Sequence, residues 1–569
     1  MDQHGSANNS VACKFALQKR SAPLDYIYRW RAVIVRRMYA HLARMNISCR
    51  AALLGSLAAL SMHAVAGDGA VPANASIEQL RLALDSGHVT SEQLVRYYLD
   101  RIERFDKNGP HINALITLNP QILEQARRSD AEAKHKSNKG ILYGIPFIAK
   151  DNYDTQGIAT SGGSAALEHS VPSANAFVVQ KLLDQGALLV GKANMSELAA
   201  SYGRLGYSSA GGLTVNPYNT ARDVSGSSSG SAAAVAADFA TFALGTDTSG
   251  SLRGPANVAG VVGVRPTLGL TSRGGVIPLS LTFDTTGVLA RSVKDAAIVL
   301  DAIVGADSQD AATLQQPANH GGYAAAVASH SLQGTRLGVI TNFRGANAEV
   351  DGIEKIVLRE LAAHGAVLVP VALPKEFENL WRSVLGPVGE AEFKPQFERY
   401  LQTLSATQPK TLEQLIEISE SPAVADSPTP VNPERLKGLR QAETTQLTDS
   451  PTYIHILTQV IPSLRLQLRS ALTANKLQAF VFSTMSCPAT PRFDRADPSY
   501  RCNSDDPYKA SYIASAAGFP EVTVPVGRTS ANLPDGISFM GLPYHETKLL
   551  GLANALEVIR PPMPGPQLR

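Results

Sequence analysis

Cysteine, tryptophan and charged residues are scarce in this chain of 569 residues. It contains four Cys and two Trp, and only 18% of its residues are charged. Neither a C-x-x-C nor an H-E-x-x-H motif occurs, because His545-Glu546 is followed by Leu549 where a second His would be needed. These absences disfavour a zinc enzyme. The 44% of hydrophobic residues is enough for a sizeable core and is unlike a disordered or coiled-coil chain.

An excess of positive charge is also missing from most of the chain. The net charge is +3, but residues 1–50 carry nine Lys or Arg against two Asp or Glu, and residues 67–569 sum to −4. The body of the protein therefore lacks the basic character of a nucleic-acid binder, and we expect no nucleic-acid partner.

A hydrophobic run long enough to span a membrane is absent too. The apolar run at residues 51–60 follows basic residues, contains Gly55 and Ser56, and precedes Ala64-Val65-Ala66, an A-x-A cleavage pattern. We predict that residues 1–66 are an N-terminal extension with a signal peptide cleaved after Ala66, and that the protein is exported to the periplasm or secreted. A translation start at Met45 would give a signal peptide of ordinary length. An N-terminal membrane anchor or a disordered tail is the alternative.

Two cysteines remain after such a cleavage, Cys487 and Cys502, and they lie 15 positions apart. In an oxidising compartment this pair is compatible with a disulfide. Two unrelated buried thiols are equally compatible with the sequence.

Short apolar runs alternate with helical patterns from Ser76 onward. Ser76 with Gln79, and Thr90 with Gln93, each fit a capping box that begins a helix. The alternation predicts an α/β fold with a mixed sheet, in a single large domain over residues 74–560. The runs that we expect to form strands are residues 143–149, 187–190, 261–264, 337–340, 479–483 and 522–526, with helices at residues 176–185 and 232–240.

Residues 404–450 interrupt this alternation. Several Pro residues lie there between polar helical stretches. The segment is either a lid near the substrate or a peripheral excursion, and the sequence does not decide between them.

Two clusters of Gly and Ser stand close together within residues 223–255, on either side of a short helical run and an apolar run. A flexible linker fits this pattern poorly, because ordered apolar segments lie tightly between the clusters. Two such loops can bring hydroxyls and free backbone N–H groups into one pocket. The first cluster also contains G-x-S-x-G, the nucleophile elbow of α/β-hydrolases, with Ser228 as nucleophile and His545 as its nearest later His. We rank an esterase of this type lower, because the residues before the motif are polar rather than strand-like.

The same residues resemble the amidase signature family. The segments that carry the resemblance are GIPFIAKDNYDTQG, GKANMSELA, GSSSGSAAAVAA, GTDTSGSLRGPA, GVVGVRPTLGLTSRGGVIPLS, DTTGVLARSVKDAA, AAGFPEVTVPVG and GISFMGLPYHETKLLGLANALE. Together they cover nearly all of residues 76–560, and the serine-rich cluster and leader look closest to the bacterial peptide-amidase branch. The resemblance implies a single-domain α/β fold with helices on both faces of a central mixed sheet, and removal of ammonia from carboxamides, including peptide C-terminal amides.

The resemblance also implies roles for particular residues. The family's lysine falls on Lys150, its bridging serine on Ser227 and its nucleophile on Ser251. A cis peptide is implied at Gly226–Ser227. The oxyanion hole is expected from the loop that ends at the nucleophile, with the N–H groups of Thr248, Ser249 and Gly250. Ser225 and Ser249 stand where the family more often has glycine.

Elementary chemistry supports these roles. A serine hydroxyl is a weak nucleophile unless a neighbour takes its proton. Neither loop contains a His, whereas Lys150 follows an apolar run that could bury it, and burial lowers a lysine pKa until the neutral amine acts as a base. Such a mechanism needs no metal or organic cofactor. Lys192 is a competing base, and we expect Asp247 and Arg253 to have structural roles.

Two other functions share the signature. One is the glutaminase-type component of the tRNA-dependent amidotransferase, which needs cytoplasmic partner subunits and fits poorly with an export leader. The other is a catalytically inactive amidase-like binding protein, which would typically lack one of the three catalytic groups.

Overall fold

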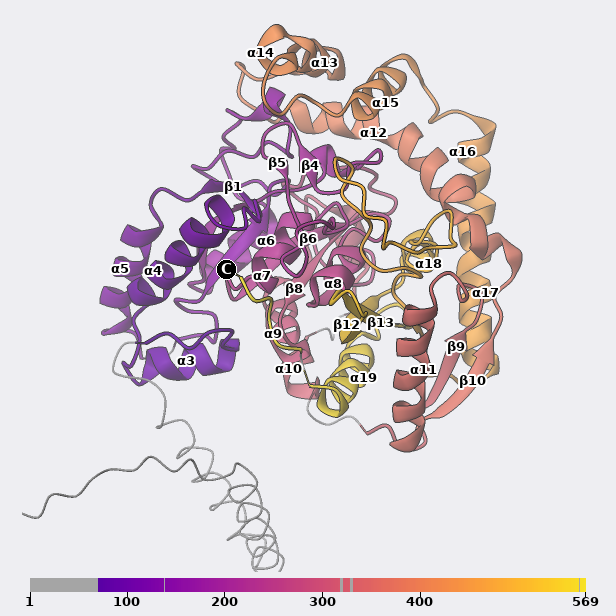
Figure 1. Cartoon of the computed structure of the whole chain (residues 1–569). Coiled ribbons are helices and arrows are strands. Elements are labelled where there is room, and N and C mark those ends of the chain that lie inside the picture. Colours follow the sequence, from indigo (N-terminus) through magenta and orange to yellow (C-terminus); the bar gives the residue numbers. More distant parts are fainter. Residues whose placement is uncertain (1–69, 138, 318–320, 328–330, 562, 569) are drawn as a thin grey trace, which may run out of the picture. The chain divides into compact units, whose positions relative to one another are not determined.

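The computed structural model describes residues 70–569, apart from residues 138, 318–320, 328–330, 562 and 569 (Figure 1). The predicted leader, with its cleavage site after Ala66, lies outside the described residues, as do Cys13 and Cys49.

Eleven of the described strands form one mixed sheet. They are β1 (Leu115–Leu118), β2 (Pro146–Lys150), β3 (Leu188–Ala193), β6 (Phe242–Asp247), β7 (Val262–Arg265), β8 (Thr285–Ala290), β9 (Arg336–Ile340), β10 (Val367–Val371), β11 (Ala479–Ser483), β12 (Glu521–Arg528) and β13 (Pro534–Met540). Their order in the sheet is β1-β3-β2-β6-β8-β7-β12-β13-β11-β9-β10. Strand β2 runs parallel to both β3 and β6, whereas β6 and β8 are antiparallel. Strands β4 (Tyr207–Ser208) and β5 (Gly212–Leu213) form a separate pair.

Helices surround this sheet. They are α3 (Ile77–Asp85), α4 (Ser91–Arg101), α5 (Ile122–Ala133), α6 (Phe177–Asp184), α7 (Ser229–Ala236), α8 (Arg253–Ala259), α9 (Val293–Ile303), α10 (Tyr323–Ala326), α11 (Ala348–Ala363), α12 (Gly386–Leu401), α13 (Leu412–Glu420), α14 (Pro422–Ala425), α15 (Pro433–Thr444), α16 (Pro451–His455), α17 (Ile461–Ala474), α18 (Tyr512–Ala517) and α19 (Glu546–Ile559). Shorter helical turns are η1 (Ile102–Lys107), η2 (Ala165–Leu167), η3 (Glu197–Ala199), η4 (Ala311–Gln315), η6 (Lys375–Asn379), η7 (Trp381–Leu385) and η8 (Ile456–Val460).

Apolar side chains project from both faces of the central strands and pack against helices. Phe147 and Phe242 pack with residues of α6, α9 and α19 in one cluster, whereas Ile148 and Ala243 pack with α7 and α8 in another. Successive side chains of a strand point to opposite faces, so these two clusters lie on opposite sides of the sheet. Covering both faces explains why the central strands are apolar runs without polar alternation, and it agrees with the predicted α/β architecture.

The predicted elements correspond closely to the observed ones. Both capping boxes form, and β11 coincides with the predicted run at residues 479–483. The helix predicted at residues 232–240 instead begins at Ser229 and ends at Ala236, because the chain turns before Phe242 to enter β6. The strand predicted at residues 143–149 begins only at Pro146, after a turn in which Gly144 has a positive φ.

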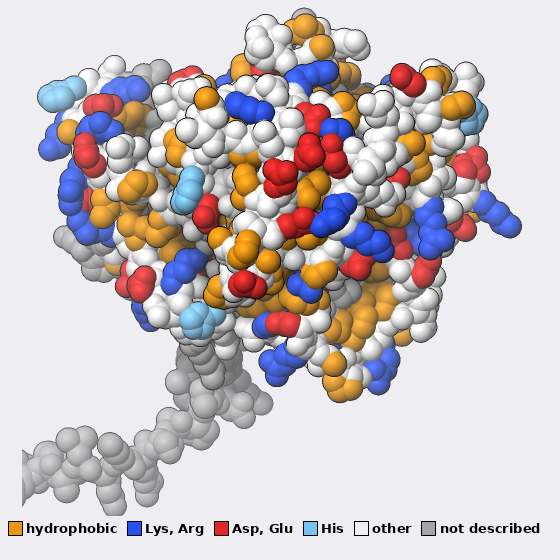
Figure 2. All heavy atoms as spheres, turned by 90° about the horizontal axis from the view of Figure 1, so that it is seen from above, with side chains coloured by type: hydrophobic (Ala, Val, Ile, Leu, Met, Phe, Trp, Pro, Cys, Tyr) orange, Lys and Arg blue, Asp and Glu red, His pale blue; other side chains and the backbone are white. Residues whose placement is uncertain are grey.

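Residues 404–450 form α13, α14 and α15, which lie together with α12 and α16 at the top of Figure 1. Their apolar residues build a separate cluster with Phe393 and Phe397 of α12. Among the described residues, no helix is both long and apolar enough to cross a bilayer. Basic and acidic side chains are interspersed over the face drawn in Figure 2.

Candidate active site

Three segments meet at one edge of the sheet. Strand β2 ends at Lys150 and the parallel strand β6 ends at Asp247, so both chain ends leave the sheet on the same side. The loop after β6 carries Ser251 and leads into α8, while the loop before α7 carries Ser227. The Ser228 N–H donates to the Ser251 carbonyl at 3.2 Å, which holds the two loops together. The predicted pocket between the Gly/Ser loops is therefore present.

Lys150 is fully buried beneath these loops. Its Nζ lies 2.7 Å from the Ser227 Oγ and 2.8 Å from the Thr246 Oγ1. Burial lowers the pKa of Lys150 to about 7, although the negative charges of Asp247 and Asp284 act in the opposite direction. An amine with this pKa is about half neutral at pH 7, and the neutral form can accept a proton.

The two serines occupy the same cavity. Ser227 is 2% exposed and Ser251 is 7% exposed, and both line it. The peptide bond Gly226–Ser227 is cis, as the family resemblance implies. Among the described residues, no hydrogen bond joins the hydroxyls of Ser227 and Ser251. Catalytic hydrogen bonds are often long in an enzyme without substrate and tighten when substrate binds.

Asp247 organises the nucleophile loop. Its carboxylate accepts hydrogen bonds from the N–H groups of Gly250 and Leu252, at 2.9 and 3.0 Å, and forms ion pairs with Arg253 and Arg265 at 2.9 and 2.8 Å. Burial alone would raise the pKa of this carboxyl, but the two guanidinium charges lower it well below its usual range. The structural roles expected for Asp247 and Arg253 agree with these contacts.

This network corrects one predicted residue of the oxyanion hole. The Gly250 N–H donates to the Asp247 Oδ1, so this predicted donor is already engaged within the loop. Thr248, Ser249 and Ser251 of the same loop line the cavity, and their N–H groups are the candidate donors. Ser249 is not among the residues with positive φ, so its replacement of a glycine needs no unusual backbone, whereas Ser225 has a φ of 58°.

The competing base, Lys192, lies in different surroundings. It is buried on β3, next to β2, and its Nζ contacts the Asp151 carboxylate at 3.3 Å and the Thr160 Oγ1 at 2.7 Å. Lys192 does not contact either Gly/Ser loop by any hydrogen bond in the part of the chain that the structure describes. This arrangement favours Lys150 as the base.

The alternative nucleophile, Ser228, is occupied by backbone contacts. Its Oγ donates to the Thr246 carbonyl at 3.1 Å and accepts from the Thr246 N–H at 3.2 Å, and the side chain is fully buried. No hydrogen bond links Ser228 to His545 within the described ranges. The elbow of an α/β-hydrolase also follows a strand, whereas no strand precedes Ser228 closely. The geometry therefore does not support an esterase that uses Ser228.

The cavity above Ser251 has a volume of about 510 Å³ and two contrasting walls. The serine wall consists of Gly226, Ser227, Thr248, Ser249 and Ser251. The helical wall comes from η7, α12 and α15 and includes Trp381, Leu385, Glu390, Phe393, Arg435 and Gln441. The guanidinium of Arg435 lies 4.8 Å from the Phe393 ring centre, which joins α15 to α12. The segment at residues 404–450, whose place the sequence left open, thus supplies part of the cavity wall.

Two further residues of this site were missed from the sequence. Thr246 accepts a hydrogen bond from Lys150 and another from the Asn152 Nδ2 at 3.1 Å. Asp284 accepts from the Thr248 Oγ1 at 2.5 Å, which holds the hydroxyl of a cavity residue. The alternation of strands could have shown that Thr246, the next-to-last residue of β6, lies near the end of β2 at Lys150. No group of three or more His, Cys, Asp or Glu side chains suited to a metal ion occurs among the described residues.

Comparisons with known proteins agree on one family. Residues 93–550 match the family model described as Amidase. A probable amidase of Arabidopsis thaliana is 34% identical over 505 residues, covering 85% of this chain and 89% of that protein. A glutamyl-tRNA(Gln) amidotransferase subunit of Chlorobium phaeobacteroides is 32% identical, covering 85% of this chain and 98% of that protein.

Solved structures show the same relationship. The native peptide amidase of Stenotrophomonas maltophilia has a TM-score of 0.78 to this chain at 36% identity, covering 87% of this chain and 98% of that one. A glutamyl-tRNA(Gln) amidotransferase subunit of Thermotoga maritima has a TM-score of 0.68 at 26% identity, with 88% of this chain and all of that one covered.

Proposed function

Because the chain belongs to the amidase family and is a hydrolase that acts on amides, we propose that it cleaves the C–N bond of carboxamides with Ser251, Ser227 and Lys150. The products are a carboxylate and ammonia. The observation that carries the proposal is the 2.7 Å contact between the buried Lys150 Nζ and the Ser227 Oγ, in the same cavity as Ser251. A buried lysine near neutrality beside two serines is the combination that serine activation requires.

The proton moves along this row of groups. Neutral Lys150 accepts the proton of the Ser227 hydroxyl while Ser227 takes the proton of Ser251, whose Oγ attacks the carbonyl carbon. When the tetrahedral intermediate collapses, the C–N bond breaks and the proton returns to the departing nitrogen, which leaves as ammonia. Water then hydrolyses the acyl-enzyme by the same relay. The proton transfers all pass through the side chains of Ser251, Ser227 and Lys150.

The oxyanion is stabilised by N–H groups of the serine wall. Thr248, Ser249 and Ser251 are the candidate donors, because Asp247 occupies the N–H of Gly250. One such donor contributes about 3–4 kcal/mol to transition-state stabilisation in other acyl-transfer enzymes. The ion pairs of Asp247 hold the loop in place before the substrate arrives, so little reorganisation is needed during the reaction.

Peptide C-terminal amides are the substrate class that we propose. A cavity of about 510 Å³ is large for a short aliphatic amide, and the helical wall offers apolar and aromatic surface from Trp381, Leu385 and Phe393. The structural similarity to the peptide amidase of Stenotrophomonas maltophilia supports the same class.

Two other functions predict different results. A glutaminase-type amidotransferase component would copurify with partner subunits; the lower TM-score to that enzyme, 0.68 against 0.78, favours the peptide amidase. An inactive binding protein would leave Ser251 unlabelled by a fluorophosphonate probe. Labelling of the wild type, absent from a Ser251→Ala variant, would exclude it.

Ammonia release tests the proposal. The purified protein is assayed with a peptide C-terminal amide, an aryl amide and a short aliphatic amide, and the peptide amide is expected to give the highest kcat/KM. The Ser251→Ala variant should keep the fold and the Tm but lose activity by on the order of 10⁴-fold or more. Undiminished turnover in that variant would refute the role of Ser251, whereas a preference for the aliphatic amide would refute only the substrate class.

Export is a further part of this proposal. Its support is the bond between Cys487 and Cys502, since disulfides persist mainly in oxidising compartments. Amino-terminal sequencing of the protein from its native host should find Gly67 as the first residue, and a mature protein that retains the preceding residues would contradict cleavage after Ala66.

A further inference from the structure

Tyr508 connects the two loops of the candidate active site. Its hydroxyl donates to the Ser225 Oγ at 2.7 Å, two residues before the bridging Ser227. Its ring also borders the nucleophile loop: a Cβ added to Gly254 would lie 2.8 Å from the Tyr508 Cε1, and one added to Gly250 would lie 4.0 Å from its Cδ1. The side chain lines the same cavity as Ser227 and Ser251. One aromatic side chain therefore contacts both loops that carry the serines.

The loop conformation near Ser227 depends on this neighbourhood. Ser225 has a φ of 58°, which few residues other than glycine adopt. Its N–H donates to the Asp223 Oδ1 at 2.9 Å and its carbonyl accepts from the Ser229 Oγ at 2.6 Å. With the bond from Tyr508, the N–H, carbonyl and hydroxyl of Ser225 are each held by a different partner. Ser227 follows two residues later, so the backbone conformation of Ser225 helps to set the position of Ser227.

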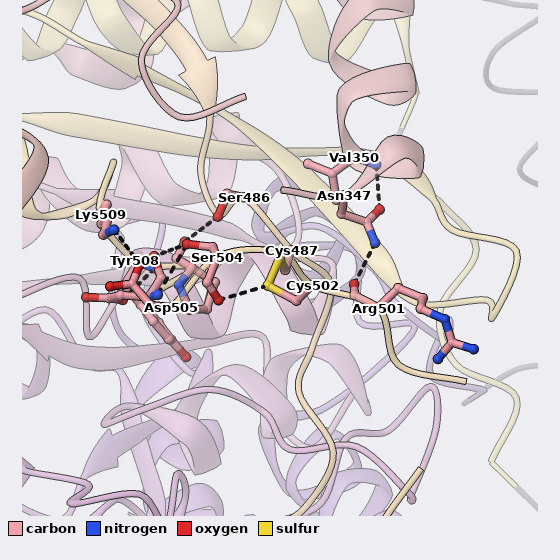
Figure 3. Close-up of a disulfide and its surroundings, with 12 residues drawn as sticks. Asn347, Val350, Ser486, Cys487, Arg501, Cys502, Ser504, Asp505, Tyr508 and Lys509 are labelled. Atoms are coloured by element: carbon pink, nitrogen blue, oxygen red, sulfur yellow. Dashed lines mark hydrogen bonds and ion pairs between the residues drawn. A yellow bond between two sulfur atoms is a disulfide. The ribbon is translucent and has the colours of Figure 1, made fainter. Parts of the chain in front are cut away.

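A disulfide anchors the segment that carries Tyr508. Cys487 and Cys502 are joined by a bond of 2.01 Å, and Tyr508 lies close by in the same segment (Figure 3). The Ser504 Oγ donates to the Asp506 carbonyl at 2.8 Å, and the Tyr508 N–H donates to the Asp506 Oδ1 at 3.0 Å. These contacts link Ser504, two residues after Cys502, through Asp506 to the backbone of Tyr508.

The chain on the other side of the disulfide is tied to the same place. The Ser486 N–H, next to Cys487, donates to the Pro507 carbonyl at 3.1 Å. Within the loop that the disulfide closes, the Thr490 carbonyl accepts from the Asp223 N–H at 3.0 Å, and Asp497 forms an ion pair with Arg222 at 2.9 Å. The closed loop thus supports residues 222–225 from outside, while Tyr508 supports them from the cavity.

We propose that Tyr508 is a positioning residue for Ser227, and that the Cys487–Cys502 disulfide holds Tyr508 in place, so that full amidase activity requires the oxidised pair. The inference rests on the proposed function, because it concerns the same serine relay. A dithiol reductant would supply two electrons and two protons to the sulfur pair, giving two thiols, and would itself become a disulfide. The loop would then be free to move, and a shift of about 1 Å at a catalytic group can lower the rate by about 10²-fold.

A double-mutant cycle tests the contact itself. We expect Tyr508→Phe and Ser225→Gly each to lower kcat by about 10-fold with KM within about twofold. The double variant should be no slower than either single variant, because both changes remove the same hydrogen bond. Glycine accepts the positive φ of Ser225, so this variant is compatible with the fold. Tyr500→Phe removes a hydroxyl from the same segment and serves as the matched control, with kcat unchanged.

Reduction tests the anchor. A dithiol, or a Cys487→Ser/Cys502→Ser variant, should lower the kcat of the wild type but cause no further loss in Tyr508→Phe. Circular dichroism at the assay temperature shows whether the reduced protein remains folded; if it does not, the double-mutant cycle alone decides. Unchanged kcat in Tyr508→Phe, additive losses in the cycle, or full activity of the folded, reduced enzyme would each overturn the inference. A wild type that hydrolyses no amide would instead overturn the proposed function.

Discussion

The two walls of the cavity are built in opposite ways. In the serine wall and the strands behind it, side chains are buried and hydrogen-bonded at short range, from Lys150 through Thr246 to Asp247. The helical wall is more open, because its Trp381 is 47% exposed and its Glu390 is also exposed. Sites on rigid strands and their loops suit chemistry that needs exact placement, whereas a more open wall can change shape without disturbing it. We therefore expect changes in the serine wall to lower kcat and changes in the helical wall to alter KM.

The largest effect in this comparison is expected from Lys150→Met. Loss of the general base should lower kcat/KM by about 10²- to 10⁴-fold, measured by ammonia release. Lys192→Met is the matched control, because it removes an equally buried amine from the neighbouring strand. It leaves the Asp151 carboxylate without its cation, so it should lower the Tm but retain most of the activity. Greater loss in Lys192→Met than in Lys150→Met would reverse the assignment.

The pH profile comes next. Only neutral Lys150 accepts a proton, so kcat/KM should rise with pH through an inflection near pH 7 and level off above it. At pH 5 the rate should be about 100-fold below the plateau, because about 1% of a group with this pKa is then neutral. A profile that stays flat between pH 5 and 8 would show that Lys150 is not the titrating base.

A smaller change is expected from Thr246→Val. The substitution keeps the shape but removes the acceptor for the Lys150 Nζ, so kcat should fall by about 3- to 10-fold. The inflection should move to lower pH, since a hydroxyl acceptor stabilises the ammonium form more than the amine. Thr241→Val removes a buried hydroxyl that contacts Tyr98 instead, and should shift neither value. An unchanged profile in Thr246→Val would show that Thr246 does not influence the pKa of Lys150.

An effect of similar size, but on KM rather than kcat, should come from the helical wall. Trp381→Ala removes an aromatic side chain that lies 5.8 Å from the Tyr512 ring centre and lines the cavity. We expect KM for peptide amides with bulky apolar side chains to rise about 5- to 10-fold, while kcat for a short aliphatic amide stays unchanged. A comparable loss of kcat for both substrates would show that the two walls are not independent.

The fold was most predictable where burial determines the residue type. The central strands could be predicted from their apolar runs, because both faces of the sheet are covered. The serine loops could be predicted because Gly and Ser cluster there. The partners of polar groups were harder to predict. Loop folding in three dimensions decides these contacts. Examples are the hydrogen bond from the Gly250 N–H to Asp247 and the one from Lys150 to Thr246. The position of α15 beside the cavity could not be predicted either, since its sequence does not distinguish a helix that lines a cavity from one on the surface.

The environment of Asp247 has a consequence for acid exposure. With two guanidinium groups holding its pKa far below the usual range, this carboxylate stays ionised, and its stabilising contribution persists, at acidities well beyond those that protonate Lys150. Mild acid would therefore lower turnover by protonating Lys150, while the ion pairs of Asp247 and the loop that they hold stay intact. Returning the same sample to neutral pH should bring catalysis back at once, with no lag for rebuilding the site.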